Sequence, residues 1–324
     1  MLPHVSFIIP CFNERHYVAS CLASVSQQQA DPASFETIVV DNGSLDGTRE
    51  LAASLGAKVL VNERPGAAAS RNLGAHVARG ALLAFVDADC LLDPTWLPTL
   101  SGHFASRQVA AAAAPAVPVA EGMTWVEEAW SRVFVNLARR SRGGVTSVSN
   151  LASSNLLIVK SHFDAVGGFD ETLLSCEDYD LSQRLLQHGT LLLDENISVA
   201  HLRESKTVQE LFRREIARGR FSLRCFIKNG CRLRELPSTA IPFITLVNVA
   251  VLVLAVARQK DQAALLAISL LAVPIIYLVR SGQRLQGVKS SLQQYLIAAT
   301  YVAARAVALI KELCDMSLSN RRNL

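Results

Sequence analysis

The stretch Leu82-Leu83-Ala84-Phe85-Val86-Asp87-Ala88-Asp89 is an apolar run that ends in two carboxylates separated by one residue. Such a run is typical of a buried strand, and α/β proteins bind their ligands at the carboxyl edge of the sheet. Asp87 and Asp89 would share a face on a strand, and on a tight turn both could approach one hard cation. Helix capping explains Asp93, which precedes Pro94, but it does not account for the other two acids. We therefore predict the active site at the end of this strand.

Three earlier segments also have the length and composition of strands, and each is followed by a segment with helical spacing. These predicted strands are Val5 to Ile9, Phe35 to Val40 and Lys58 to Val61. Strands that alternate with helices of about a dozen residues indicate a parallel sheet with right-handed crossovers. The expected fold class is therefore α/β, with a mostly parallel sheet flanked by helices.

Polar residues follow the first two predicted strands as well, namely Asn13-Glu14 and Asp41. Parallel strands bring these side chains to the same edge as the acidic pair. The region has neither the Gly-x-Gly-x-x-Gly pattern of a dinucleotide fold nor the Gly-Lys-Ser/Thr of a P-loop. Acids that bind base and ribose hydroxyls, with a metal that neutralises a pyrophosphate, indicate a different nucleotide chemistry. Arg71, on the helix after the third strand, is either a phosphate-side cation or an exposed helix arginine.

Four segments of the chain form an ordered pattern. They are Ile8-Ile9-Pro10-Cys11-Phe12-Asn13-Glu14, Val39-Val40-Asp41-Asn42-Gly43-Ser44 with Asp46-Gly47-Thr48, Pro65-Gly66 with Ala69-Ser70-Arg71-Asn72-Leu73-Gly74, and Phe85-Val86-Asp87-Ala88-Asp89. In this order they resemble the signature of membrane-attached family-2 glycosyltransferases with the type-A fold, the type that builds polysaccharides and glycolipids of the cell envelope. The resemblance implies a nucleoside-diphosphate sugar as donor, with a UDP-sugar expected, and a divalent metal, Mg²⁺ or Mn²⁺, as cofactor.

The same resemblance implies individual site residues. The implied donor-binding residues are Pro10, Phe12, Glu14, Asp41, Arg71 and Asp87. Among them Pro10, Glu14 and Asp41 would lie near the base, and Asp87 near the ribose. Asp89 would bind the metal.

A second acidic segment, Cys176-Glu177-Asp178-Tyr179-Asp180-Leu181, opens a predicted helix. Acids in a first helical turn stabilise the helix dipole by about 0.3–1 kcal/mol, which explains Asp180 and is one explanation of Glu177. By the resemblance, Glu177 marks the acceptor site and Asp178 would be the general base. Inverting transfer needs one carboxylate within hydrogen-bond reach of the acceptor hydroxyl, opposite the leaving nucleotide.

His201 follows a short apolar strand, Ile197 to Ala200. A histidine at a strand end is often structural, but type-A transferases commonly have a late histidine near the metal, so His201 is the second metal ligand we expect. The aromatic Gln-x-x-Arg-Trp motif of processive synthases is missing, and Arg214-Glu215-Ile216-Ala217-Arg218 stands in its place. We therefore expect one sugar to be added per binding event.

Hydrophobic residues make up half of the 324-residue chain, which has a net charge of +4, and the uncharged runs gather after residue 237. We predict a catalytic domain at 1–202, a basic amphipathic juxtamembrane helix region at 203–237 and a helical membrane region at 238–324. Within the last, 238–257 and 262–279 are each long enough to span a bilayer as a hairpin. The segment 291–313 is either interfacial or a third span, because its central arginine, Arg305, is costly in lipid.

The segment from Arg203 to Arg234 carries ten Lys or Arg and three Glu. This balance fits an anionic cytoplasmic leaflet better than nucleic acid. The predicted helix Lys206 to Lys228 either lies on the membrane surface or packs on the sheet. The seven cysteines are scattered without a Cys-x-x-Cys pair, which indicates reduced thiols, and no signal peptide pattern is present. We expect a multi-pass protein of the cell inner membrane with its catalytic domain in the cytoplasm.

The leading hypothesis is an inverting, metal-dependent, non-processive glycosyltransferase with a membrane-associated, lipid-linked saccharide acceptor. Within this class, transfer to a polyprenyl phosphate is the alternative, and its anionic acceptor needs no base. A nucleotidyltransferase should carry a Gly-rich basic loop after the first strand, where Pro10-Cys11-Phe12-Asn13 offers none. A non-catalytic membrane scaffold has no need of acids at three strand ends together with Asp178.

Overall fold

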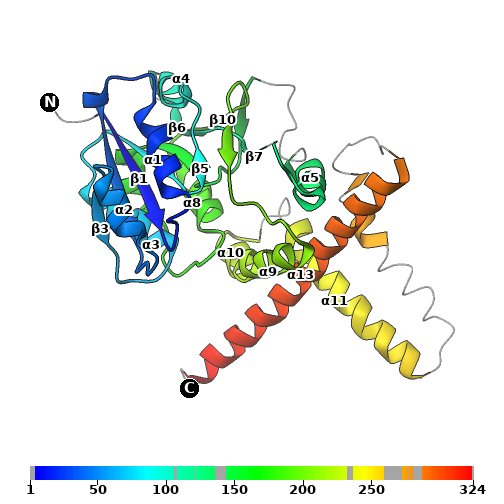
Figure 1. The fold of residues 1–324 in the computed structure, drawn as a ribbon. Coiled ribbons are helices and arrows are strands. Elements are labelled where there is room, and N and C mark those ends of the chain that lie inside the picture. The colour runs from blue at the N-terminus through cyan, green and yellow to red at the C-terminus, as the bar shows by residue number, and fades with distance from the viewer. Residues whose placement is uncertain are drawn as a thin grey trace. The chain divides into compact units, whose positions relative to one another are not determined.

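The computed structural model describes residues 4–105, 108–119, 121–135, 144–231, 236–258, 272–276, 278–279 and 287–322. The chain divides into two compact units. The first comprises Met1–Val119 and Ser141–Arg203, and the second comprises Ala120–Arg140 and Glu204–Leu324. Residues 121–135, which lie inside the expected 1–202 domain, fall in the second unit. Figure 1 shows the described helices and strands of both units.

The first unit is built on an eight-stranded sheet with the order β3-β2-β1-β4-β9-β6-β10-β8. The strands are β1 (Val5–Cys11), β2 (Phe35–Asp41), β3 (Lys58–Val61), β4 (Leu82–Val86), β6 (Val109–Ala113), β8 (Val145–Val148), β9 (Asn155–Val159) and β10 (Thr190–Asp194). The half formed by β3, β2, β1 and β4 is parallel, as predicted. Strand β9 runs antiparallel to both β4 and β6, and β8 runs antiparallel to β10, so the sheet as a whole is mixed.

A second, three-stranded sheet has the order β5-β11-β7. Its strands are β5 (Cys90–Leu91), β7 (Ala116–Pro118) and β11 (Val199–His201). Strands β5 and β11 are antiparallel, and their register places His201 opposite Cys90. This small sheet thereby joins the segment after the acidic pair to the late histidine.

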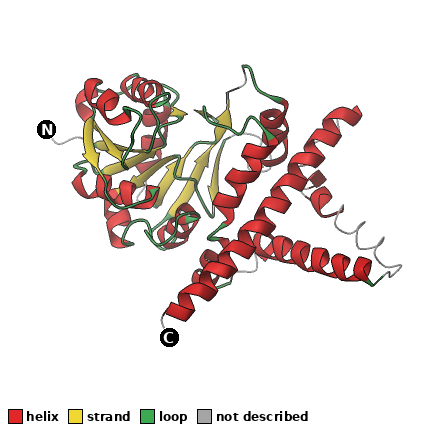
Figure 2. Ribbon diagram, turned by 60° about the horizontal axis from the view of Figure 1, so that its bottom comes forward, coloured by secondary structure: helices red, strands yellow, loops and turns green. Residues whose placement is uncertain are grey.

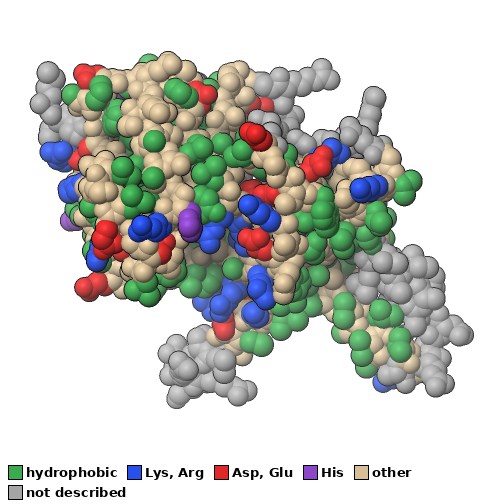
Figure 3. All heavy atoms as spheres, viewed as in Figure 1, with side chains coloured by type: hydrophobic (Ala, Val, Ile, Leu, Met, Phe, Trp, Pro, Cys, Tyr) green, Lys and Arg blue, Asp and Glu red, His purple; other side chains and the backbone are tan. Residues whose placement is uncertain are grey.

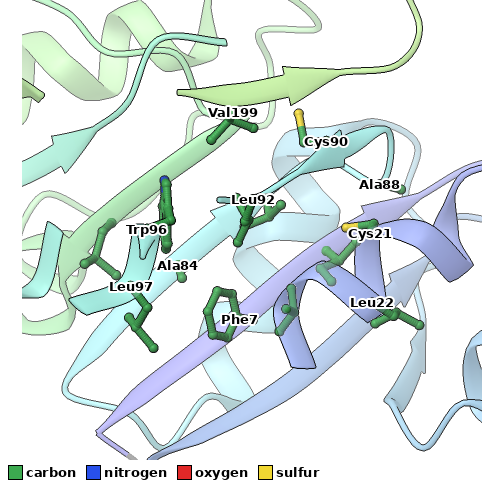
Figure 4. Packing of buried hydrophobic residues seen from close by; sticks show 14 of the residues in the cluster. Phe7, Cys21, Leu22, Ala84, Ala88, Cys90, Leu92, Trp96, Leu97 and Val199 are labelled. Atoms are coloured by element: carbon green, nitrogen blue, oxygen red, sulfur yellow. The ribbon is translucent and has the colours of Figure 1, made fainter. Parts of the chain in front are cut away.

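Helices cover both faces of the large sheet, because successive side chains of a strand point to opposite faces (Figure 2). Phe7 and Ile9 of β1 are buried in a core with α1 (Val18–Ser26), α2 (Thr48–Ser54) and α4 (Trp96–Gly102), part of which Figure 4 shows. Ile8, between them, packs in the opposite core. That core is completed by α3 (Ala67–Val77), α7 (Lys160–Ala165) and α8 (Glu177–Leu185). Two short 3₁₀ helices, η1 (Pro32–Ser34) and η2 (His103–Ala105), complete this unit's described helices.

Helix α3 lies close to the sheet because Gly74 has no side chain. A Cβ atom at this position would lie 2.4 Å from Cγ2 of Ile8 and 3.2 Å from Cγ2 of Val40. Neither neighbour is flexible, since both are buried and β-branched. This contact fixes the distance between the sheet and the helix that carries Arg71.

The second unit is helical where it is described. Its helices are α5 (Trp125–Trp130), which continues as a π-helical turn over Ser131–Val135, α9 (Val208–Gly219), α10 (Ser222–Lys228), α11 (Leu236–Ala257) and α13 (Gly287–Arg322). The segment predicted as one helix from Lys206 to Lys228 is two helices, α9 and α10. Leu211 of α9 is buried with Val126 of α5 and Ile297 of α13. The apolar face of α9 therefore packs on other helices of this unit.

Arg305 lies inside the segment predicted to be interfacial or a third span, within α13. Its guanidinium binds Glu215 of α9 at 2.9 Å, and Glu215 also binds Arg218 at 2.9 Å. Because Glu215 is only 1% exposed, the charge of its carboxylate has to be compensated, and these two cations do so. The arginine that would be costly in lipid is thus neutralised inside the unit.

Helix α11 coincides with the first predicted span and carries large apolar side chains that are 42–61% exposed. Figure 3 shows hydrophobic side chains along this helix, at lower right as in Figure 1. Within the described part of the chain, no helix is both long enough and apolar enough to cross a membrane. Most of the second predicted span, 262–279, lies outside the described residues.

Candidate active site

A cavity of about 220 Å³ lies at the carboxyl edge of the parallel half of the sheet, where the sequence predicted the site. Its lining includes six of the predicted donor and metal residues, Pro10, Phe12, Glu14, Arg71, Asp87 and Asp89. The side chains come from three separate segments of the chain, namely the end of β1 with the residues that follow it, helix α3, and the turn after β4. Their roles in binding a donor or a metal stay predictions.

Asp87 and Asp89 lie on a tight turn and not on the strand itself. Strand β4 ends at Val86, and the N–H of Cys90 donates to the carbonyl of Asp87 at 3.0 Å. The carbonyl of Asp89 accepts the N–H of Leu202 at 2.8 Å, which ties this turn to the end of β11. Of the two geometries considered from the sequence, the turn is the one observed.

Arg71 is buried between two of the predicted acids. Its guanidinium binds Asp87 Oδ1 at 2.8 Å and Glu177 Oε1 at 2.9 Å, and it lies 5.4 Å from the ring centre of Phe169. Burial alone would lower the pKa of Arg71, but the two carboxylates more than offset this and raise it. Arg71 is therefore a charged link between the turn after β4 and the start of α8, and not an exposed helix arginine.

Helix α8 begins with acidic residues, directly after a residue with a left-handed backbone conformation. Cys176, with φ of 64°, precedes the helix, and Glu177 and Asp178 form its first turn. Burial and the nearby charge of Glu177 raise the pKa of Asp178 to about 7, although the positive charge of Arg71 opposes this shift. A carboxyl group with such a pKa is well matched to accept a proton near neutral pH.

Glu14 is tied to the end of the first unit by Arg203, which binds Glu14 Oε1 at 2.8 Å. The other oxygen, Oε2, is buried and has no hydrogen-bond partner among the described residues. Burial raises the pKa of Glu14 to about 7, with Asp89 and Asp87 contributing and Arg203 opposing. An unsatisfied buried oxygen in the cavity lining is a polar contact open to a ligand.

Asp41 is predicted to lie near the base, but its carboxylate turns back onto its own loop. It accepts the N–H groups of Gly43 and Ser44 at 3.2 Å, and the side chain is 1% exposed. The neighbouring Asn42 lines the cavity instead. The contact of Asp41 with a donor stays a prediction, and the structure gives this residue a turn-forming role.

The predicted metal residues approach each other at the small sheet. Asp89 Oδ1 and His201 Nε2 lie 3.6 Å apart, and both side chains are largely buried. Ligand atoms of Asp89, Cys90 and His201 all lie within 4.8 Å of one another. A carboxylate oxygen and an imidazole nitrogen are donors that Mn²⁺ accepts, so these residues fit a divalent ion.

Three residues around the cavity were not predicted from the sequence. Asn42 accepts the N–H of Gly66 at 3.1 Å and donates to the carbonyl of Arg64 at 2.7 Å, so it holds the loop before α3. Arg203 pairs with Glu14, and Cys90 completes the cluster at His201. Two signals in the sequence could have pointed to these residues. Cys90 stands beside Asp89, and Arg203 stands two residues after His201.

Two solved structures have a fold similar to this one. The structure is similar to that of a mannosyltransferase from Pyrobaculum calidifontis, solved with GDP-Man and Mn²⁺, with a TM-score of 0.62 and 18% identity over 97% of this chain and 88% of that chain. It is also similar to GalNAc-T7, solved with UDP, GalNAc and Mn²⁺, with a TM-score of 0.52 and 19% identity over 63% of this chain and 44% of that chain. The first unit thus has the glycosyltransferase type-A fold.

Residues 6–164 match the family described as Glycosyl transferase family 2. The matched residues include all four motifs, so this match supports the family-2 resemblance noted there, while membrane attachment stays a prediction.

Two relatives of the chain with descriptive names are also called glycosyltransferases. The chain is 40% identical to glycosyltransferase AglE of Haloferax volcanii over 111 residues, which cover 31% of this chain and 36% of the relative. It is 34% identical to a pre-mycofactocin glycosyltransferase of Mycobacterium tuberculosis over 172 residues, which cover 51% of this chain and 37% of the relative. The match thus spans well under half of the length of each relative.

Proposed function

We propose that the chain is an inverting, metal-dependent glycosyltransferase that moves one sugar per binding event from a nucleoside-diphosphate donor to a membrane-associated, lipid-linked saccharide. The observation that carries this proposal is the convergence of acids from separate segments on one edge of the sheet. Glu14, Asp87 and Asp89 line one cavity, and Arg71 links Asp87 to the helix turn that carries Asp178. A scaffold without catalysis has no need of this costly arrangement of buried charge.

The proposed reaction is a single displacement. The acceptor hydroxyl gives its proton to Asp178 while its oxygen bonds to the anomeric carbon of the sugar. The bond from that carbon to the diphosphate oxygen breaks, and the nucleoside diphosphate leaves with the electron pair. A divalent ion held by Asp89 and His201 would supply positive charge near the diphosphate. Two structurally similar proteins were solved with Mn²⁺, which supports the choice of Mn²⁺ or Mg²⁺.

The donor we propose is a UDP-sugar bound in the 220 Å³ cavity. The two similar structures hold a GDP-sugar and UDP, so the first property to measure is which nucleotide this chain binds. Calorimetry with UDP and GDP, each with and without Mn²⁺, should give binding that requires the metal. Asp89→Ala should abolish it, whereas Asp164→Ala, at an exposed acid on α7, should leave it unchanged. Equal binding with and without metal, for both nucleotides, contradicts the proposal.

The membrane-associated acceptor is proposed from the second unit. Exposed Val253, Leu254 and Val256 lie on a helix whose sequence from 238 to 257 has no charge. A location at the inner membrane with a cytoplasmic catalytic domain belongs to the same proposal. Flotation with lipid vesicles should carry the chain upward, and Val253→Asp with Val256→Asp should reduce this. Leu45→Asp, at a residue 94% exposed in the first unit, is the control.

The acceptor itself is best sought by activity. A panel of nucleotide sugars incubated with a membrane lipid extract should give one product whose mass increases by a single sugar. A ladder of products from one binding event would contradict the non-processive mechanism.

A further inference from the structure

The small sheet brings a thiol to the predicted metal side of the site. Cys90 and His201 are directly opposite each other on the antiparallel strands β5 and β11. Side chains of directly opposite residues lie on the same face, with Cβ atoms about 5 Å apart. The register alone therefore predicts that the Cys90 sulfur and the His201 ring approach each other. The ligand atoms of the two residues and of Asp89 do lie within 4.8 Å of one another.

Cys90 lies at the boundary between the core and this cluster. It is fully buried and packs in the apolar core with Leu92 and Val199, as Figure 4 shows. Val199 is two residues from His201 on β11, so the two side chains share one face of the small sheet. The Asp89 and His201 side chains are 13% and 11% exposed, so the cluster is closed on the core side and reachable from the other.

The donor set combines sulfur, nitrogen and oxygen. Thiolate and imidazole together favour Zn²⁺, and Co²⁺ follows the same preference, whereas Mg²⁺ and Mn²⁺ prefer oxygen ligands. Three protein ligands with an open fourth position are also a common zinc arrangement.

We propose that Asp89, Cys90 and His201 bind a thiophilic divalent ion such as Zn²⁺, with the Cys90 thiolate as a ligand, and that this ion excludes Mn²⁺ or Mg²⁺. On binding, the Cys90 S–H bond breaks, a metal–sulfur bond forms, and the proton goes to solvent. The exclusion of Mn²⁺ rests on the proposed function, whereas the thiolate site itself does not. The chain thereby acquires sensitivity to zinc at the same place where it binds its working metal.

The test uses Co²⁺ as a spectroscopic probe in the full chain with Cys231→Ser and Cys314→Ser, which remove the two exposed thiols. Co²⁺ should produce an ultraviolet thiolate-to-cobalt charge-transfer band, which Zn²⁺ then removes by displacement. Cys90→Ser should abolish the band. Cys21→Ser, at a buried cysteine of the same core, should retain it. A band that survives in Cys90→Ser overturns the proposal.

A second measurement does not depend on a variant that folds. X-ray absorption at the zinc edge of the Zn²⁺-loaded background protein should show a sulfur neighbour at about 2.3 Å. A shell of only nitrogen and oxygen overturns the proposal.

Manganese binding separates this inference from the proposed function. In electron paramagnetic resonance, Zn²⁺ should displace bound Mn²⁺ at lower concentration from the background protein than from Cys90→Ser, while both bind Mn²⁺. If neither binds Mn²⁺ but the cobalt band depends on Cys90, the proposed working metal is wrong and the thiolate site stands. If both bind Mn²⁺ and Zn²⁺ displaces it equally from each, the thiolate site is wrong.

Discussion

Arg71 donates a hydrogen bond of 2.8 Å to Asp87 from a position that is only 4% exposed. The same guanidinium binds Glu177, so one buried cation compensates two carboxylates. Removing one partner of a buried ion pair costs about 3–5 kcal/mol, because the other charge stays buried without compensation. Asp87 is 31% exposed, so we place the expected loss near the lower end of that range.

Arg71→Met should therefore lower the free energy of unfolding by about 3 kcal/mol in urea denaturation, as a buried unpaired charge requires. Arg49→Ala removes an exposed pair with Glu50 and should change it by less than about 1 kcal/mol. Equal losses in the two variants would show that the Arg71 contacts contribute no more than a surface pair.

The pKa of Asp178, raised to about 7, predicts the pH dependence of catalysis. A general base must be deprotonated, so kcat/KM should rise with pH up to about 7 and level off above it. Asp178→Asn should lower kcat by a factor of about 10²–10⁴ and remove this limb of the profile. The pH profile of both forms is the measurement. Near-normal turnover of Asp178→Asn with bound donor and metal would favour a polyprenyl phosphate acceptor, which needs no base.

The raised pKa of Asp178 also predicts how the stability of the folded chain depends on pH. Stability should fall as pH rises, whereas kcat/KM should rise. The carboxyl pKa rises from 3.8 to about 7 on folding, so the folded state binds the proton more tightly than the unfolded state does. The stabilisation of the folded state by this tighter proton binding is complete below about pH 4 and is lost as pH rises to about 7. Asp178→Asn should therefore be more stable than the natural chain at pH 8, with the difference shrinking toward pH 4. Thermal melts at these two pH values test it, and a difference that does not change with pH speaks against it.

Gly74→Ala should destabilise the first unit, because the added Cβ meets Ile8 at 2.4 Å. Overpacking of this kind costs about 1–3 kcal/mol. Gly102, at the end of α4, has no atom within 4 Å of an added Cβ, so Gly102→Ala should be neutral or slightly stabilising. Chemical denaturation of both variants measures the difference, and a harmless Gly74→Ala would mean that α3 can move away from the sheet.

Much of the first unit was predictable because its signals are local. The parallel half of the sheet follows from apolar runs such as Leu82 to Val86, and the acids Glu14, Asp41 and Asp87 stand at or shortly after the ends of their strands. The direction of β9 was not predictable, because a short apolar run looks the same in a parallel and an antiparallel pair. The turn contacts of Asp41 were foreseeable, since an Asp-Asn-Gly-Ser sequence commonly binds its own backbone.

The site contacts that were missed join distant parts of the chain. The burial of Arg71 depends on Phe169 and Glu177, about a hundred residues later, so its own helix gave no sign of it. The pairing of Cys90 with His201 rests on a ladder of two residue pairs, which is too short for a periodic signal. Arg305 was judged as a charge in lipid because its partner Glu215 lies on another helix.

Asp89 and His201 are more than a hundred residues apart in the sequence, yet their side chains lie 3.6 Å from each other. An ion held by both would act as a removable cross-link that closes a long loop of the chain. Such a closure favours the folded state by restricting the unfolded one, and it does so only while the ion is present. Resistance to proteolysis should accordingly follow the free metal concentration, even in the absence of any sugar donor.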